Sequence, residues 1–171
     1  NERLFHSRLN FATAISATRI GRVGVTAYVH AEKPLVVVRV RLPAQQQAGG
    51  ASRDCEIKFL SVFDKDRKPT PGAAADQLGA TVDKLGYPPL EKGRTKEGVS
   101  YILQCCAQET SFIVAWVTAK TKDEWTIYLT VQQAFSGQCP LPLAEQALKD
   151  AKATGAAKLE KSHVAWWRNY W

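Results

Sequence analysis

The sequence has no methionine among its 171 residues, and its first residues do not follow the pattern of a signal peptide. No apolar run approaches the ~20 residues that a membrane-spanning helix needs. The net charge is +7, but Lys and Arg are scattered and form no continuous block. We therefore expect the natural start of the protein to lie outside this sequence. We also expect no membrane span and no nucleic-acid partner.

Cysteine is scarce, and its spacing excludes the common zinc motifs, because no CxxC pair occurs. Two of the cysteines are adjacent, and adjacent residues on a strand point to opposite faces, so both cannot reach one partner. A single disulfide and a role as small buried hydrophobic residues both stay open for this set. Its members are Cys55, Cys105, Cys106 and Cys139.

Histidine is equally sparse, and we expect His6 and His30 to stand alone, because no constellation with Ser, Cys or metal ligands is visible for either. Neither a phosphate-binding loop nor a dinucleotide fingerprint is present. The sequence therefore predicts no cofactor and no metal site.

The first two-thirds of the chain shows the alternation of apolar and polar residues that is typical of strands. Turn residues separate the runs, at residues 18–21 among other places, and residues 35–42 are apolar enough for a central strand. The last three runs follow one another closely and predict an antiparallel meander. The runs are residues 9–15, 23–29, 35–42, 57–62, 100–108, 111–119 and 124–133.

Residues 64–98 interrupt this pattern with a stretch rich in Lys, Pro and Gly. We expect a long excursion from the sheet, with one helical turn at residues 73–78. The role of this insert stays open.

Helical periodicity begins only after Cys139, where Pro142 suits the first turn of a helix and Gly155 interrupts it. Strands followed by helices, with no alternation of the two, predict a mainly β fold. We expect an antiparallel β-sandwich domain over residues 1–138 and a helical connector over residues 139–171.

The end of the chain is unusually aromatic, and Leu159, His163, Trp166, Trp167 and Tyr170 fall on one face of a helix. A large aromatic side chain buries roughly 150–250 Å², so this face needs a substantial partner surface. No Gly, Asn or Pro ends the helix. We therefore expect the helix to have been cut and to lead toward an absent domain.

The stretch from His163 to Trp171, with the Ala-rich helix before it, resembles the connector of bacterial glycoside hydrolases of the alpha-L-fucosidase-like group. The earlier order of strand, turn, strand, Pro and an apolar strand ending in Arg39 is similar to their N-terminal sandwich. In these enzymes linker helices join a large, supersandwich-like domain to a catalytic (α/α)6 barrel. The resemblance implies that this chain is part of such a sandwich with its linker helices.

The resemblance also implies that the catalytic carboxylates lie in the absent barrel, so no catalytic residue is transferred to this chain. Its own acidic residues, such as Asp64 and Asp123, sit mostly in turns, where a solvated role is expected. The implied function is a non-catalytic domain that supports the active site of a carbohydrate-degrading hydrolase of the periplasm or cell exterior. The partners would be the helical catalytic domain and an oligosaccharide.

The candidate functional residues are therefore those of the terminal helix, as domain-interface or sugar-contact residues. Helical spacing favours packing between domains over stacking on sugars. The candidates are His163, Trp166, Trp167 and Trp171.

A second hypothesis is a free-standing, lectin-like sandwich that binds carbohydrate through Trp116, Trp125 or Tyr128. A complete module has no reason to end in an exposed aromatic run. If the chain is a fragment, we expect that cutting it near Gly155 leaves the sandwich intact. If it is a complete module, the same cut should unfold it.

Overall fold

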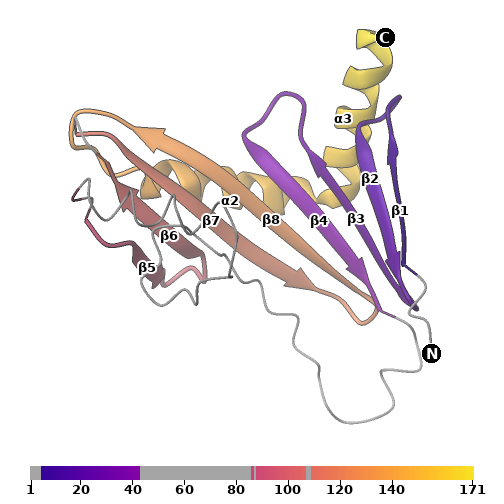
Figure 1. The fold of residues 1–171 in the computed structure, drawn as a ribbon, viewed down its shortest axis with the longest axis horizontal. Helices are drawn as coiled ribbons and strands as arrows, with labels where there is room; N and C mark the ends of the chain where they lie inside the picture. Colours follow the sequence, from indigo (N-terminus) through magenta and orange to yellow (C-terminus); the bar gives the residue numbers. More distant parts are fainter. Residues whose placement is uncertain (1–4, 43–85, 87, 107–108) are drawn as a thin grey trace.

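The structure is a computed structural model that describes residues 5–42, 86, 88–106 and 109–171 (Figure 1). Its strands form an 8-stranded sheet in the order β1-β2-β3-β4-β8-β7-β6-β5, and every neighbouring pair is antiparallel. The strands are β1 (Phe5–Asn10), β2 (Ile15–Ile20), β3 (Val23–Val29), β4 (Leu35–Arg41), β5 (Glu91–Arg94), β6 (Ser100–Cys105), β7 (Ser111–Lys120) and β8 (Glu124–Ala134). Two helices follow, α2 (Leu141–Thr154) and α3 (Ala156–Tyr170).

Both helices lie against one face of the sheet, which we call the helix face (Figure 1). Alternate residues of the strands point to it, as Val37 and its register partner Tyr128 do. With α2 and α3 they enclose the larger core. Its buried members are Tyr28, Leu35, Val37, Val99, Ile113, Ala115, Tyr128, Ala144, Leu148, Ala151 and Leu159.

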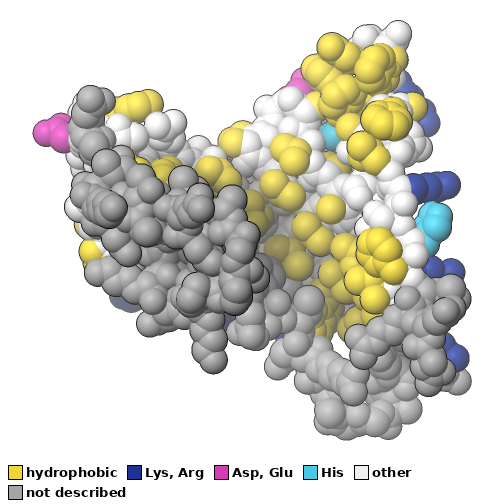
Figure 2. Space-filling view, viewed as in Figure 1, with side chains coloured by type: hydrophobic (Ala, Val, Ile, Leu, Met, Phe, Trp, Pro, Cys, Tyr) yellow, Lys and Arg dark blue, Asp and Glu magenta, His cyan; other side chains and the backbone are white. Residues whose placement is uncertain are grey.

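The opposite face, which we call the second face, is also apolar. Val40, Trp125 and Ile127 are buried there, and Val23, Val25, Val38, Leu42 and Trp116 pack against them. Figure 2 views the sheet with the helices behind it and shows hydrophobic side chains gathered over its central strands. A sheet with apolar residues on both faces has the character of a sandwich layer. The predicted class, a mainly β, antiparallel, sandwich-like domain followed by a helical connector, is confirmed.

The prediction of one strand over residues 9–15 is wrong, because a turn divides it. The side chain of Asn10 accepts a hydrogen bond from the Ala12 N–H at 3.0 Å, and Ala14 has a φ of 48°. Asn favours such a local turn over continued pairing. β1 and β2 therefore form a hairpin. The turn expected at residues 18–21 is also misplaced, because residues 18–20 belong to β2 and the turn lies at Gly21 and Arg22.

The other boundaries follow the predictions closely. Five strands, β3, β4, β6, β7 and β8, match predicted runs to within a few residues, and the first helix begins at Leu141, directly after Pro140. β5 was missed, because it lies at the end of the predicted insert. The expected strand at residues 57–62 and helical turn at 73–78 lie outside the described residues. Cys105, Cys106 and Cys139 are free thiols, and Cys55 also lies outside the described residues.

Candidate functional site

The terminal helix α3 is set apart from α2 by Gly155, whose φ of 81° and ψ of 149° no helix contains. Glycine has no Cβ and adopts this backbone conformation without strain. The chain turns at this residue and α3 then runs across the N-terminal strands (Figure 1).

One stripe of α3 changes from buried to exposed along its length. Leu159 is 1% exposed and His163 is 0% exposed, whereas Trp171, two turns further on, is 74% exposed. Trp167, between them, is half-buried. Residues four apart lie above one another on a helix, so the first half of this stripe belongs to the core and the last turn projects beyond it.

His163 lies at the centre of a buried aromatic cluster. Its ring stacks on Tyr28 with centroids 4.6 Å apart and planes at 26°, and it meets the edge of Trp167 at 6.4 Å. Both His163 nitrogens, the Tyr28 hydroxyl and the Trp167 Nε1 are buried without a hydrogen-bond partner. Burial lowers the pKa of His163, and the backbone of Thr13 and Ala14 partly offsets this shift. Burial therefore favours the neutral form of the ring.

His30 joins this cluster at 5.9 Å from the His163 ring. Its Nε2 lies 3.0 Å from the Ser162 hydroxyl, and its Nδ1 accepts the Glu32 N–H at 3.2 Å. The expectation that His30 stands alone is therefore wrong. The acceptor role of Nδ1 leaves the proton on Nε2, so the imidazole donates to Ser162. A catalytic Ser–His pair needs the opposite polarity, in which the imidazole accepts the hydroxyl proton.

The last turns of α3 form an aromatic ladder. Trp166 stacks on Tyr170 at 5.2 Å with planes at 11°, and Trp167 lies 6.1 Å from Trp171. The Trp171 Nε1 donates to the Phe11 carbonyl at 3.1 Å, which ties the end of the helix to the β1–β2 turn. Tyr170 and Phe11 are 62% and 75% exposed. The ladder and the turn together present an exposed aromatic surface (Figure 2).

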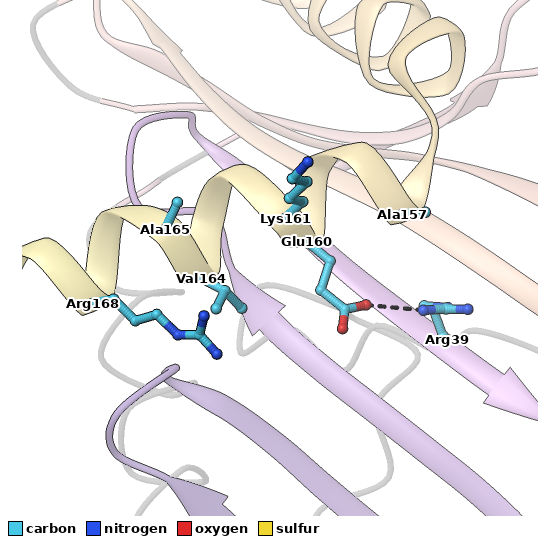
Figure 3. Close-up of a pocket in the computed structure, with 7 residues that line it drawn as sticks. All are labelled: Arg39, Ala157, Glu160, Lys161, Val164, Ala165 and Arg168. Atoms are coloured by element: carbon cyan, nitrogen blue, oxygen red, sulfur yellow. Dashed lines mark hydrogen bonds and ion pairs between the residues drawn. The ribbon is translucent and has the colours of Figure 1, made fainter.

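A charged cavity of about 440 Å³ lies along the other flank of α3, where the helix passes over β4 (Figure 3). The Arg39 guanidinium crosses its end, bonded to both carboxylate oxygens of Glu124 at 2.8 and 3.0 Å and to Glu160 at 2.9 Å. These hydrogen bonds raise the pKa of Arg39. Burial raises the pKa of Glu124, but the bonds from Arg39 and Arg41 outweigh it and lower that pKa overall. The cavity is lined by Arg39, Ala157, Glu160, Lys161, Val164, Ala165 and Arg168.

The structure thus brings together all four residues predicted as the site, His163, Trp166, Trp167 and Trp171, in one aromatic group on α3. It adds Tyr28, His30 and Arg39, which sequence reasoning missed because they are distant in the chain. Of the residues named for the lectin hypothesis, Trp125 and Tyr128 are 7% and 4% exposed and cannot stack on a sugar.

Within the described ranges, no three His, Cys, Asp or Glu side chains gather as a metal site would require. None of the described helices is long and apolar enough to cross a bilayer.

No protein-family model matches the sequence. No curated protein sequence matches it either. A solved structure described as "Putative kojibiose phosphorylase from human microbiome" is similar to it, with a TM-score of 0.63 over 97% of this chain and 10% sequence identity. At that identity the likeness shows a shared fold. The chain spans 23% of the length of that protein.

Proposed function

We propose that this chain is a non-catalytic, N-terminal sandwich-like domain of a carbohydrate-active enzyme related to glycoside hydrolases. Its terminal helix α3 packs against a helical catalytic domain of the same parent protein. The resemblance to the alpha-L-fucosidase-like group would place the parent enzyme in the periplasm or outside the cell.

One observation carries the proposal, namely the rise in exposure from 0% at His163 to 74% at Trp171 along one stripe of α3. The helix is anchored in the core by its first half, so its end is held out in a fixed direction. Trp and Tyr are the residues most enriched at the centres of protein interfaces. An aromatic ladder on a rigid helix is suited to enter a second domain.

The fold likeness supports the same proposal. The similar solved structure is named as a phosphorylase of kojibiose, and this chain spans 23% of its length. A piece of such an enzyme would contain the sandwich-like layer and its linker helices, with the reacting groups elsewhere. We therefore expect the chain alone to turn over no aryl glycoside.

The test is to express the gene beyond the codon for Trp171 and to compare hydrogen exchange of residues 166–171 in the longer protein and in this chain. We expect these amides and the Trp171 ring to become protected in the longer protein. Equal exchange in both proteins would reject the packing of a catalytic domain on α3.

A lectin-like module is the competing outcome of the same experiment. It predicts no further domain, together with binding of oligosaccharide by the chain alone. A blue shift of tryptophan emission on adding maltooligosaccharides or fucosylated oligosaccharides, abolished by Trp166→Ser and Trp171→Ser, would favour the module.

A further inference from the structure

We propose that a basic groove between α3 and the N-terminal strands binds a carboxylate-rich segment of polypeptide. The groove consists of the cavity of about 440 Å³ along α3 and a neighbouring depression of about 160 Å³, which share Arg39. This inference does not rest on the proposed function, because it concerns the charged flank of α3 and not its aromatic end.

The floor of the groove is made of small side chains on the helix face of the sheet. In the register of the strands, Ala17 lies opposite Thr26, and Thr26 lies opposite Arg39. In the next row Gly24 lies between Arg19 and Arg41. A Cβ added at Gly24 would meet only the Cβ of Arg41, at 4.0 Å. The floor therefore has room for the backbone of another chain segment.

Positive charge surrounds this floor. The same two rows carry Arg8 beside Ala17 and Arg19 beside Gly24, in addition to the two arginines of β4. The α3 lining of the cavity adds Lys161 and Arg168, of which Arg168 extends toward the strands (Figure 3). Among the residues that the structure describes, the carboxylates paired with this region are those of Glu124 and Glu160. Six cationic side chains against two carboxylates leave an excess of four positive charges.

Several of these cations are able to bind a carboxylate. Arg39 uses three of its five N–H groups on Glu124 and Glu160, which leaves two N–H groups at the cavity. Lys161 and Arg168 are exposed, and neither forms an ion pair with another residue in the described ranges. A cluster of positive charges that exceeds its carboxylate partners is attractive to a polyanion.

The remaining lining favours polypeptide over nucleic acid or sugar. Bases and sugar rings need aromatic platforms on which to stack, and none of the residues that line the two cavities is aromatic. Instead, Ala157, Val164 and Ala165 form an apolar stripe between the charged residues of α3. Such a stripe fits the methylene groups of Glu side chains, whose carboxylates then reach the flanking cations.

The experiment uses the full chain and a fluorescein-labelled decaglutamate peptide, with binding followed by fluorescence anisotropy at about 0.15 M salt, where the Debye length is ~8 Å. We expect saturable binding that Lys161→Glu with Arg168→Glu weakens by about tenfold or more, since ~1.4 kcal/mol of lost attraction is a factor of ten. The matched control is Lys96→Glu with Lys149→Glu, which makes the same change of net charge at exposed positions outside the groove, between β5 and β6 and on α2. It should change the affinity by less than ~2-fold because surface charges far from the site are screened.

A second variant tests the shape of the site at constant charge. Gly24→Thr adds a side chain on the floor, favours the strand conformation and should weaken decaglutamate binding about 3-fold or more by steric exclusion. Equal losses in the two charge-reversed pairs, or full binding by both the groove pair and Gly24→Thr, would overturn the proposal. Tighter binding of a decathymidylate, lost with the same groove residues, would assign the groove to a phosphate backbone and also overturn it.

Discussion

The two halves of the helix face are built differently. Under α2, the meander of β6, β7 and β8 is closed by apolar contacts, with Ile113 and Ala144 at 0% and Leu148 at 1% exposure. Under α3, the N-terminal strands carry an imidazole cluster, a basic groove and an exposed aromatic ladder. Both halves belong to one continuous sheet, so the difference comes from the side chains that each helix presents.

That difference indicates which half is complete by itself. Buried polar atoms without partners and exposed aromatic side chains both raise the free energy of an isolated domain. Among the described residues most of them lie on α3 and the strands beneath it; the exceptions are the side-chain Oε1 of Gln104 and the exposed Phe135. The α2 half stabilises the domain, and the α3 half supports our proposal of a partner.

The largest loss of stability should come from a substitution in the core of the α2 half. Leu148→Ala removes a fully buried side chain of α2 and should lower the free energy of unfolding by about 2–5 kcal/mol. Leu143→Ala, on the same helix but 56% exposed, should cost less than ~1 kcal/mol. Urea denaturation measures both, and similar losses in the two variants would contradict the packing of α2 described above.

The next effect tests the charged contact between α3 and β4. Arg39→Met leaves Glu124 with Arg41 as its partner and frees Glu160, which should cost about 1.5–3 kcal/mol. Arg41→Met is the control, because that side chain is 68% exposed and its ion pair should contribute less than ~1 kcal/mol. Equal urea midpoints for the two variants would show that the Arg39 contacts are not stabilising.

A smaller effect should appear as a pH dependence of the imidazole cluster. Burial lowers the pKa of His30 and His163 below the ordinary value of 6.5, so the unfolded chain binds more protons as the pH falls. Stability from these groups is complete above pH 6.5 and is lost on acidification below it. The Tm should therefore fall between pH 7.5 and about 5.5, and His163→Phe should flatten this slope while the control His6→Gln, on exposed β1, should not. A Tm independent of pH across this window would count against a buried neutral His163.

The smallest effect on stability is expected at the end of α3. Trp171→Ser loses one hydrogen bond to Phe11 and little buried area, and should lower the free energy of unfolding by less than ~1 kcal/mol. Sedimentation velocity should show reduced self-association in this variant, because exposed aromatic surface promotes association. Cooperative unfolding caused by this substitution would show that the ladder belongs to the core. It would contradict the difference between the α2 and α3 halves described above.

The structure also changes the expectation for a larger cut. Deleting the chain from Gly155 was expected to leave a fragment's sandwich intact, yet Leu159 and His163 lie in the main core. Such a deletion removes core side chains whichever hypothesis holds, so it does not separate them. A cut after Val164 keeps Leu159 and His163 and removes the aromatic ladder, so its effect on stability does distinguish the fragment from the complete module.

The sequence predicted the features that depend on local pattern. Alternation in β3, β4, β7 and β8 reports which residues face the core, and Pro142 and Gly155 mark where helices begin and end. Features that depend on local competition were missed, as at the turn after Asn10, where a side-chain hydrogen bond ends a run that alternates correctly. β5 was missed because Glu91-Lys-Gly-Arg94 has no apolar alternation and pairs only with an existing edge.

The candidate site was predicted in part for the same reason. The aromatic residues of α3 are neighbours in sequence, so helical periodicity places them on one face. His30 and Ser162 are 132 residues apart, and Arg39 and Glu124 are 85 residues apart. Only the register of the sheet and the course of α3 bring these groups together, and neither leaves a local signal.

Because α3 starts directly after Gly155, a small change in the backbone angles of this residue would move the far end of the helix by several ångströms. The helix has 15 residues and is therefore about 22 Å long at ~1.5 Å per residue. A rotation of ~10° about its first residue would move the indole of Trp171 by about 4 Å at that helix rise. The φ and ψ of Gly155 lie in a region that is essentially restricted to glycine, although a Cβ added there would meet no atom within 4 Å. The backbone of this one residue thus sets the angle at which the aromatic tip leaves the sheet, and any other residue there would be strained at that angle.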